Sequence, residues 1–135
     1  MKNKTNHQGF TLLELLLVIA IIAILAMISV GRYQNHVMVS NRWAAQSMLL
    51  LAQQQMEREF LRSSTYEDAT VEKLSVSAQA APSHVLSIRN GSLGQNTYIL
   101  DATPKAIDAL CGALSIDQSG LRQAAVFANS EQCWQ

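Results

Sequence analysis

A single carboxylic acid, Glu14, lies near the start of a largely apolar stretch over residues 10–30. Moving an ionised carboxylate into the hydrocarbon core of a membrane costs on the order of 2 to 3 kcal/mol, so such a group needs a positively charged partner. The stretch contains no Lys, Arg or His. Cutting the chain between Gly9 and Phe10 would create an α-amine four residues before Glu14, and a neighbouring molecule could present the same group. The chemistry expected at this end is pairing of the Glu14 carboxylate with a positively charged group, which either another molecule or a newly exposed α-amine could supply.

The two cysteines of the chain, Cys111 and Cys133, both lie in its last quarter. Their separation fits neither a zinc-binding pattern nor a Cys-x-x-Cys redox motif. A disulfide formed in an oxidising compartment is favoured over two buried thiols. In the chain-entropy model, closing a loop of this length would stabilise the fold by about 3 kcal/mol.

Other kinds of chemistry find little support in the sequence. His7, His36 and His84 are scattered and have no metal-ligand spacing to a Cys or an acid, so each is interpreted as a solvated or helix-surface histidine. Glu57 and Glu59 cannot share a helix face at a two-residue offset, which removes them as a catalytic pair. Neither a Gly-x-Ser-x-Gly turn nor a phosphate-binding loop occurs. The sequence therefore predicts no enzyme, no metal site and no cofactor.

The first element that must position these residues is a membrane-spanning helix over residues 10–30. As a helix this stretch would be about 31 Å long, which matches the hydrocarbon thickness of a bilayer. Two lysines precede it, and they favour a cytoplasmic amino terminus. The rival interpretation is a signal peptide that is removed whole. It is disfavoured because the run is long and the cleavage pattern after it is poor.

The rest of the chain is long enough for one small domain, since the whole chain has 135 residues. After Gly31, apolar residues recur at three- and four-residue steps, which predicts an amphipathic continuation of the helix over 31–62. Its apolar face comprises Ala45, Met48, Leu49, Ala52, Met56 and Phe60. Packing of this face against a sheet is favoured over a ligand groove.

The region 63–135 should contain a long connection up to Ser83 and then an antiparallel sheet. Its four predicted strands cover residues 84–89, 97–102, 110–116 and 121–127. A flexible tip at Asn90–Gly94 joins the first two strands, and a turn with Asp117 first and Gly120 last joins the final two. The expected fold is α+β, with the disulfide joining the start of the third strand to the tail after the fourth.

The residues Gly9-Phe10-Thr11-Leu12-Leu13-Glu14-Leu15, followed by an unbroken apolar stretch, resemble the class III signal of type IV pilins and pseudopilins. The resemblance implies that a prepilin peptidase cuts after Gly9 on the cytoplasmic side and methylates Phe10. It also implies that Glu14 neutralises the amino terminus of a neighbouring subunit during filament assembly. The chain departs from many family members at Ala23, where they have glycine, and at Gly31, where they have proline. Both positions bear on local melting of the helix.

A second stretch, from Cys111-Gly112 through Ile116-Asp117 and Gly120-x-Arg122 to Cys133-Trp134, resembles the carboxy-terminal half of PilE-type minor pilins. Together the resemblances imply a minor, low-abundance structural subunit of a type IV pilus, with residues 1–9 as a cleaved leader. Its partners would be other pilin subunits, prepilin peptidase, the inner-membrane assembly platform and, before assembly, inner-membrane lipid. The domain after the span would be periplasmic, and the finished pilus would lie at the cell surface.

Two alternatives remain, a type II secretion pseudopilin and a DNA-binding competence pilin. Ten basic and ten acidic residues cancel, which gives no electrostatic reason to expect a nucleic acid as a partner.

Overall fold

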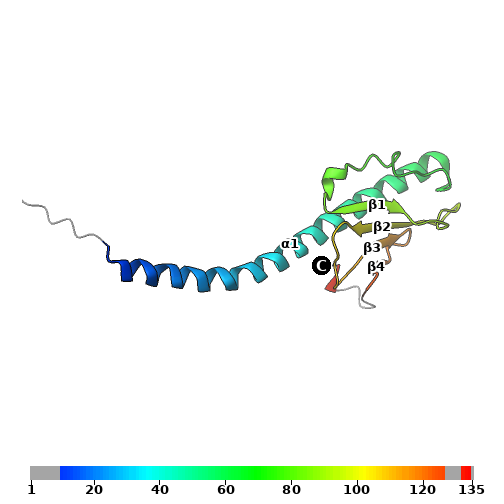
Figure 1. Ribbon diagram of the computed structural model, residues 1–135. Coiled ribbons are helices and arrows are strands. Elements are labelled where there is room, and N and C mark those ends of the chain that lie inside the picture. The colour runs from blue at the N-terminus through cyan, green and yellow to red at the C-terminus, as the bar shows by residue number, and fades with distance from the viewer. Residues whose placement is uncertain (1–9, 127–131, 135) are drawn as a thin grey trace, which may run out of the picture. The chain divides into compact units, whose positions relative to one another are not determined.

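The computed structural model describes residues 10–126 and 132–134 (Figure 1). The expected leader over 1–9, which includes Gly9, lies outside the described residues, as does Phe127 at the end of the fourth predicted strand. The elements, in chain order, are helix α1 (Leu12–Ser63), the 3-10 helix η1 (Ala78–Ala80) and the strands β1 (His84–Ile88), β2 (Ile99–Pro104), β3 (Leu114–Asp117) and β4 (Arg122–Ala124). The chain divides into two compact units between His36 and Val37.

Both ends of α1 have a local physical cause. At its start, the side-chain oxygen of Thr11 accepts a hydrogen bond from the backbone N–H of Glu14 (3.2 Å), which satisfies one of the donors that a helix leaves unpaired there. At its end, Ser64 adopts a φ of 59° and donates its N–H to the carbonyl of Phe60 (2.7 Å). The helix ends one residue beyond the predicted position.

In the first unit, the apolar side chains of α1 are exposed throughout residues 12–27. This part of the helix is long and apolar enough to cross a membrane, by length and composition. An apolar surface of this kind is stable in lipid or against other helices, not in water. The structure therefore agrees with a helix that is anchored in a membrane or packed among others.

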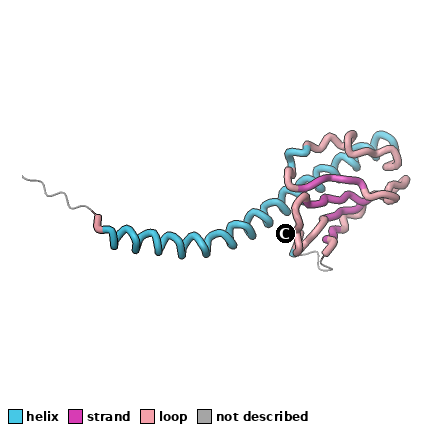
Figure 2. The backbone as a smooth tube through the Cα atoms, in the orientation of Figure 1, coloured by secondary structure: helices cyan, strands magenta, loops and turns pink. Residues whose placement is uncertain are grey.

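In the second unit, the remainder of α1 lies across one face of a four-stranded antiparallel sheet (Figures 1 and 2). The strand order β1-β2-β3-β4 follows the chain, so the predicted meander is confirmed. Its register pairs Leu86 with Ala102, Leu100 with Ile116, and Ile116 with Arg122. The predicted turn between the last two strands is also present, because Gly120 has a φ of 81° and donates its N–H to the carbonyl of Asp117 (3.0 Å).

The predicted bounds of β1 were wrong by one residue, since it ends at Ile88, and those of the other three strands were wrong by more. Strand β2 begins at Ile99 and runs on to Pro104 instead of covering 97–102, and β4 covers only Arg122–Ala124 of the predicted 121–127. Strand β3 begins at Leu114, not at residue 110. The reason for the late start is a turn, since the backbone N–H groups of Leu110 and Cys111 both donate to the side chain of Asp108 (3.1 Å each). Cys111 consequently lies before the third strand and not at its start.

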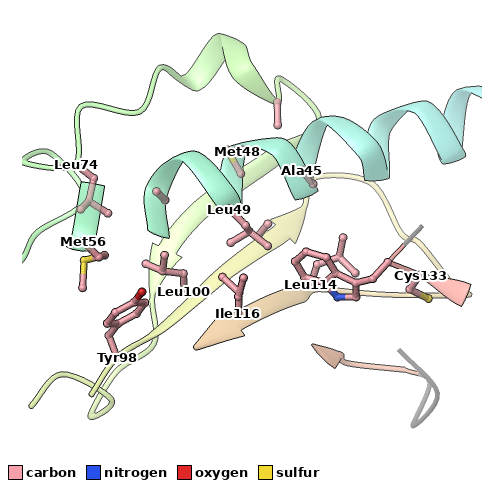
Figure 3. Close-up of a cluster of buried hydrophobic side chains, with 14 of the residues drawn as sticks. Ala45, Met48, Leu49, Met56, Leu74, Tyr98, Leu100, Leu114, Ile116 and Cys133 are labelled. Carbon is pink, nitrogen blue, oxygen red and sulfur yellow. The ribbon is translucent and has the colours of Figure 1, made fainter. Parts of the chain in front are cut away.

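The core of the second unit fills the space between α1 and the sheet (Figure 3). The predicted apolar face of the helix is confirmed: Ala45, Met48, Leu49, Ala52 and Met56 are at most 2% exposed, and Phe60 packs against them. From the sheet side, the core receives Tyr98, Leu100, Ala102, Leu114 and Ile116. Fully burying one such aliphatic side chain contributes about 1.5 to 3 kcal/mol, so this contact is the main source of stability for the second unit.

An aromatic cluster fixes the connection after α1 to the helix. The ring of Tyr66 stacks on Phe60 and meets Tyr98 edge-on, both with centroids 4.7 Å apart. The hydroxyls of Tyr66 and Tyr98 donate to the carboxylate of Glu57 (3.1 Å each). Desolvation and the hydrogen bond to Glu57 raise the pKa of Tyr66 to about 12. Glu57 is thus a structural acceptor for two tyrosines.

Candidate functional site

The residues expected to act in processing and assembly lie at the start of the described chain. Phe10 is 84% exposed and the Glu14 side chain is also exposed. Within residues 10–126 and 132–134, no Lys, Arg or His side chain forms an ion pair with Glu14. A partner for this carboxylate must therefore come from the amino terminus or from another molecule if the helix is buried in apolar surroundings.

The predicted disulfide is confirmed, since the sulfur atoms of Cys111 and Cys133 are bonded. Both half-cystines are buried, at 0% and 2% exposure. The bond closes a loop that contains β3 and β4. Because the two residues are separated by 22 positions, a reduced chain could explore many arrangements that the bond forbids.

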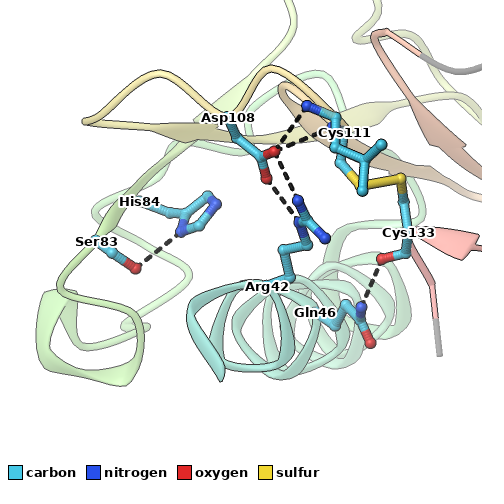
Figure 4. Close-up of polar contacts among 8 residues, drawn as sticks. Arg42, Gln46, Ser83, His84, Asp108, Cys111 and Cys133 are labelled. Atoms are coloured by element: carbon cyan, nitrogen blue, oxygen red, sulfur yellow. Dashed lines mark hydrogen bonds and ion pairs between the residues drawn. A yellow bond between two sulfur atoms is a disulfide. The ribbon is translucent and has the colours of Figure 1, made fainter. Parts of the chain in front are cut away.

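A buried ion pair beside the disulfide was not foreseen from the sequence (Figure 4). The guanidinium of Arg42 on α1 donates through Nε and through one terminal nitrogen to the two carboxylate oxygens of Asp108, at 2.7 Å each. Their side chains are only 8% and 10% exposed. The hydrogen bonds from Arg42, with help from the N–H groups of the turn, hold the pKa of Asp108 below its usual value. The pair therefore stays charged at neutral pH.

A second polar contact reaches the other half-cystine from the same helix. Gln46, which is 8% exposed, donates its side-chain amide to the backbone carbonyl of Cys133 (2.7 Å). One turn separates Arg42 and Gln46, so both lie on one face of α1. The sequence contains one signal that could have placed them: both are in helical register with the buried Ala45 and Leu49, and therefore lie on the helix face toward the sheet, although their partners cannot be identified from it.

His84 departs from expectation, because it is only 6% exposed and not a solvated histidine. Its Nδ1 lies 3.0 Å from the hydroxyl of Ser83, and its Nε2 has no hydrogen-bond partner among the described residues. Burial lowers the pKa of His84 from its ordinary value, so the ring is neutral at pH 7. His36 is exposed, as predicted, and His7 lies outside the described residues.

No group of three or more His, Cys, Asp or Glu side chains that could hold a metal ion occurs within the described part of the chain. The charged groups that do meet are paired structurally, as Arg42 with Asp108 and Arg89 with Asp101. The features of this chain that point to function are therefore the apolar amino-terminal helix with its single acid and the disulfide-bounded segment on the sheet.

Comparisons with known proteins give two family matches that together cover most of the chain. A model of the prokaryotic N-terminal methylation motif matches residues 4–30, which include Gly9, Phe10 and Glu14. A model of the family described as type IV minor pilin ComP, DNA uptake sequence receptor, matches residues 31–115. No curated protein is significantly similar to the chain in sequence.

The fold agrees with these matches. A type IV pilin from Shewanella oneidensis superimposes with a TM-score of 0.53 and is 25% identical, over 71% of this chain and 96% of that one. The long amino-terminal helix, the antiparallel meander and the carboxy-terminal disulfide are the features that the resemblance to pilins had led us to expect. The family model covers the second half of α1 and the sheet as far as β3. The chain belongs to the ComP family of type IV minor pilins.

Proposed function

We propose that the chain is made as a membrane-anchored precursor, cut between Gly9 and Phe10, methylated at Phe10 and then incorporated into a type IV pilus as a low-abundance subunit. The observation that carries this proposal is the methylation-motif match over residues 4–30, which spans the proposed cleavage site and Glu14. Prepilin peptidase would perform both modifications. The role of the chain is structural and needs no catalytic residue of its own.

The proposed arrangement in the membrane places the amino terminus in the cytoplasm and the second unit in the periplasm. The disulfide supports this arrangement, because such bonds persist in the oxidising periplasm and are rare in the cytosol. Before assembly the apolar part of α1 is surrounded by inner-membrane lipid. During assembly, the platform in that membrane transfers it to the filament, where helices of other pilin subunits replace the lipid.

The proposed role of Glu14 follows from its lack of a partner within the described residues. In the filament its carboxylate pairs with the amine of Phe10 in a neighbouring subunit, so that neither charge is buried alone. The same pairing would also fix the position at which each subunit joins the filament, since an added subunit offers its amine to a carboxylate already in place. Cleavage is therefore a precondition for assembly.

We expect the mature protein to show three changes in its intact mass, measured without reductant. Residues 1 to 9 should be lost, one methyl group should be gained, and two hydrogens should be missing because Cys111 and Cys133 are joined. A Gly9→Leu variant should keep the leader and lack the methyl group, while retaining the disulfide. A full-length mass in cells that contain prepilin peptidase would contradict the proposal.

Recovery in sheared surface fibres distinguishes a pilus subunit from a type II secretion pseudopilin. The pilus proposal expects this chain in the fibre fraction, in a small ratio to the main pilin. Confinement to the membrane and periplasm under conditions in which fibres are abundant would support the pseudopilin.

DNA binding is the second candidate function, and the description of the matched family as a DNA uptake sequence receptor favours it. Four exposed bases of the second unit form no ion pair with a described residue, namely Arg58, Lys73, Lys105 and Arg122. Phosphate contacts by such residues make affinity fall steeply with salt.

For the DNA test, duplex DNA should be titrated into the full chain in detergent at several salt concentrations. With up to four phosphate contacts, the slope of log affinity against log salt should be about −1 to −4. A Lys105→Gln variant should weaken binding and make the slope shallower by about one if Lys105 contacts a phosphate. Absence of binding at low salt would remove this function and leave the structural role unaffected.

A further inference from the structure

Both halves of the disulfide are connected by hydrogen bonds to one face of α1 (Figure 4). One connection runs from Arg42 through Asp108 to the backbone of Cys111, and the other runs from Gln46 to the backbone of Cys133. The two helix residues are one turn apart, and all four contacts lie at 3.1 Å or less. The helix thus contacts the chain on both sides of the sulfur–sulfur bond.

The connection to Cys111 is rigid because Asp108 uses its carboxylate in two directions. Toward the helix it accepts two hydrogen bonds from Arg42, and toward the sheet it accepts the N–H groups of Leu110 and Cys111. The backbone carbonyl of Asp108 also accepts the N–H of Gly112 (2.9 Å), which closes the turn. A planar guanidinium that binds both carboxylate oxygens fixes orientation as well as distance. Cys111 is therefore held in a turn whose position is set by α1.

The connection to Cys133 is a single hydrogen bond from Gln46 to its backbone carbonyl. Gln46 and Cys133 are 87 residues apart in sequence, so this contact exists only when the helix lies against the sheet. Trp134 supports it from the other side by donating its indole N–H to the carbonyl of Gln123 on β4 (3.0 Å). Cys133 and Trp134 consequently connect the helix to β4.

We infer that Arg42 and Gln46 are positioning residues for the formation of the Cys111–Cys133 disulfide, and that the bond forms efficiently only after α1 has docked on the sheet. If the contacts of Arg42 and Gln46 stabilise the oxidised protein more than the reduced protein, the disulfide must in turn stabilise those contacts by the same free energy. This reciprocity is required by thermodynamic linkage. The helix therefore acts as a template that raises the effective concentration of one thiol near the other.

The reaction itself is thiol–disulfide exchange with an external oxidant, and glutathione disulfide serves as the probe. One thiolate of the protein attacks glutathione disulfide and releases one glutathione thiolate. The second protein thiolate then displaces the other glutathione from the mixed disulfide, so that the two protein sulfurs are oxidised together and two glutathione molecules are reduced. The second step is intramolecular, and it is the step that positioning of Cys111 and Cys133 accelerates.

The test measures the equilibrium between reduced and oxidised full chain, purified in detergent, in buffers with known ratios of glutathione to glutathione disulfide. The effective concentration of the thiols equals the squared concentration of glutathione divided by the concentration of glutathione disulfide at which half of the protein is oxidised, because each protein disulfide releases two glutathione molecules. Arg42→Met and Gln46→Ala should each lower it about tenfold, because residues that touch or share one hydrogen-bond network commonly couple by about this amount. Arg58→Met and Gln54→Ala are matched controls on exposed positions of the same helix and should leave it unchanged.

A purely structural role would give a different result from a positioning role. A residue that only stabilises the fold contributes equally to the reduced and the oxidised protein, so its removal leaves the effective concentration unchanged. Values for both variants within twofold of the unaltered chain, with helix content retained by circular dichroism, would overturn the inference. If Arg42→Met does not fold when reduced, Gln46→Ala decides the question, since it removes a single neutral hydrogen bond.

A second measurement checks the same coupling without redox chemistry. Gln46→Ala should lower the urea midpoint of the disulfide-bonded chain more than it lowers that of a Cys111→Ser/Cys133→Ser chain. Equal shifts in the two backgrounds would count against positioning, even if the effective concentration had changed.

Discussion

Replacing Glu14 by glutamine should prevent this subunit from entering the filament while leaving its processing intact. Glutamine has nearly the same size and remains polar, so the change removes only the negative charge. The amine of the neighbouring subunit would then be buried without its counterion, which costs about 3 to 5 kcal/mol in comparable buried pairs. At about 1.4 kcal/mol per factor of ten, incorporation should fall by more than a hundredfold. The amount of the chain in sheared fibres, relative to the membrane fraction, measures this directly.

A matched control for Glu14→Gln is Glu67→Gln, which makes the same chemical change at an exposed position after α1. It should enter fibres at the normal level. Intact mass separates a defect in assembly from one in maturation, since Glu14→Gln should still lose residues 1 to 9 and gain the methyl group. Normal incorporation of Glu14→Gln would show that the carboxylate is dispensable, and the proposed pairing with Phe10 would have to be abandoned.

Replacing Arg42 by methionine should lower the free energy of unfolding of the second unit by about 3 kcal/mol or more. The expected loss is large because Asp108 would remain charged and buried, at 10% side-chain exposure, without its partner. Methionine keeps the apolar stem of the arginine, so lost packing contributes little. Urea unfolding of the full chain in detergent, followed through tryptophan fluorescence, measures the change.

Two further variants show whether the unpaired charge is the cause. Adding Asp108→Asn to Arg42→Met removes the stranded carboxylate, and the side-chain oxygen of asparagine can still accept the N–H groups of Leu110 and Cys111. This double variant should recover much of the lost stability. Arg58→Met, at an exposed position, should change it by less than about 0.5 kcal/mol. If the double variant is no more stable than Arg42→Met, the lost free energy of unfolding has a cause other than the unpaired charge of Asp108.

Periodic patterns in the sequence were sufficient to predict the helix and the order of the strands in the sheet. Spacing of three and four residues placed Ala45, Met48 and Met56 on the buried face, because that spacing repeats wherever a helix covers a core. The turn at Asp117–Gly120 could also be predicted from adjacent residues, because it ends in a glycine, which adopts a positive φ in the structure. With two cysteines in the chain, the disulfide had a single possible pairing within the molecule.

Features that depend on distant partners could not be read from local patterns. Residues 110 and 111 continue an apolar run and were therefore assigned to a strand, but Asp108 takes up their N–H groups, which strand pairing would need. The arginine that holds Asp108 is 66 residues away, at Arg42. His84 was expected at the surface because nothing in its sequence neighbourhood signals burial, but it is only 6% exposed and lines hollows together with Met38 and Met48 of α1.

The contacts between α1 and the end of the chain also have a consequence for biosynthesis. The core that covers the face beginning at Ala45 includes Cys133 and Trp134, the last of the residues that the structure describes. At roughly 5 to 20 residues per second, the ribosome needs about 5 to 20 s to make the intervening segment. During that interval the nascent polypeptide presents an uncovered apolar stripe, so a holdase that recognises amphipathic helices would protect it until synthesis and export are finished.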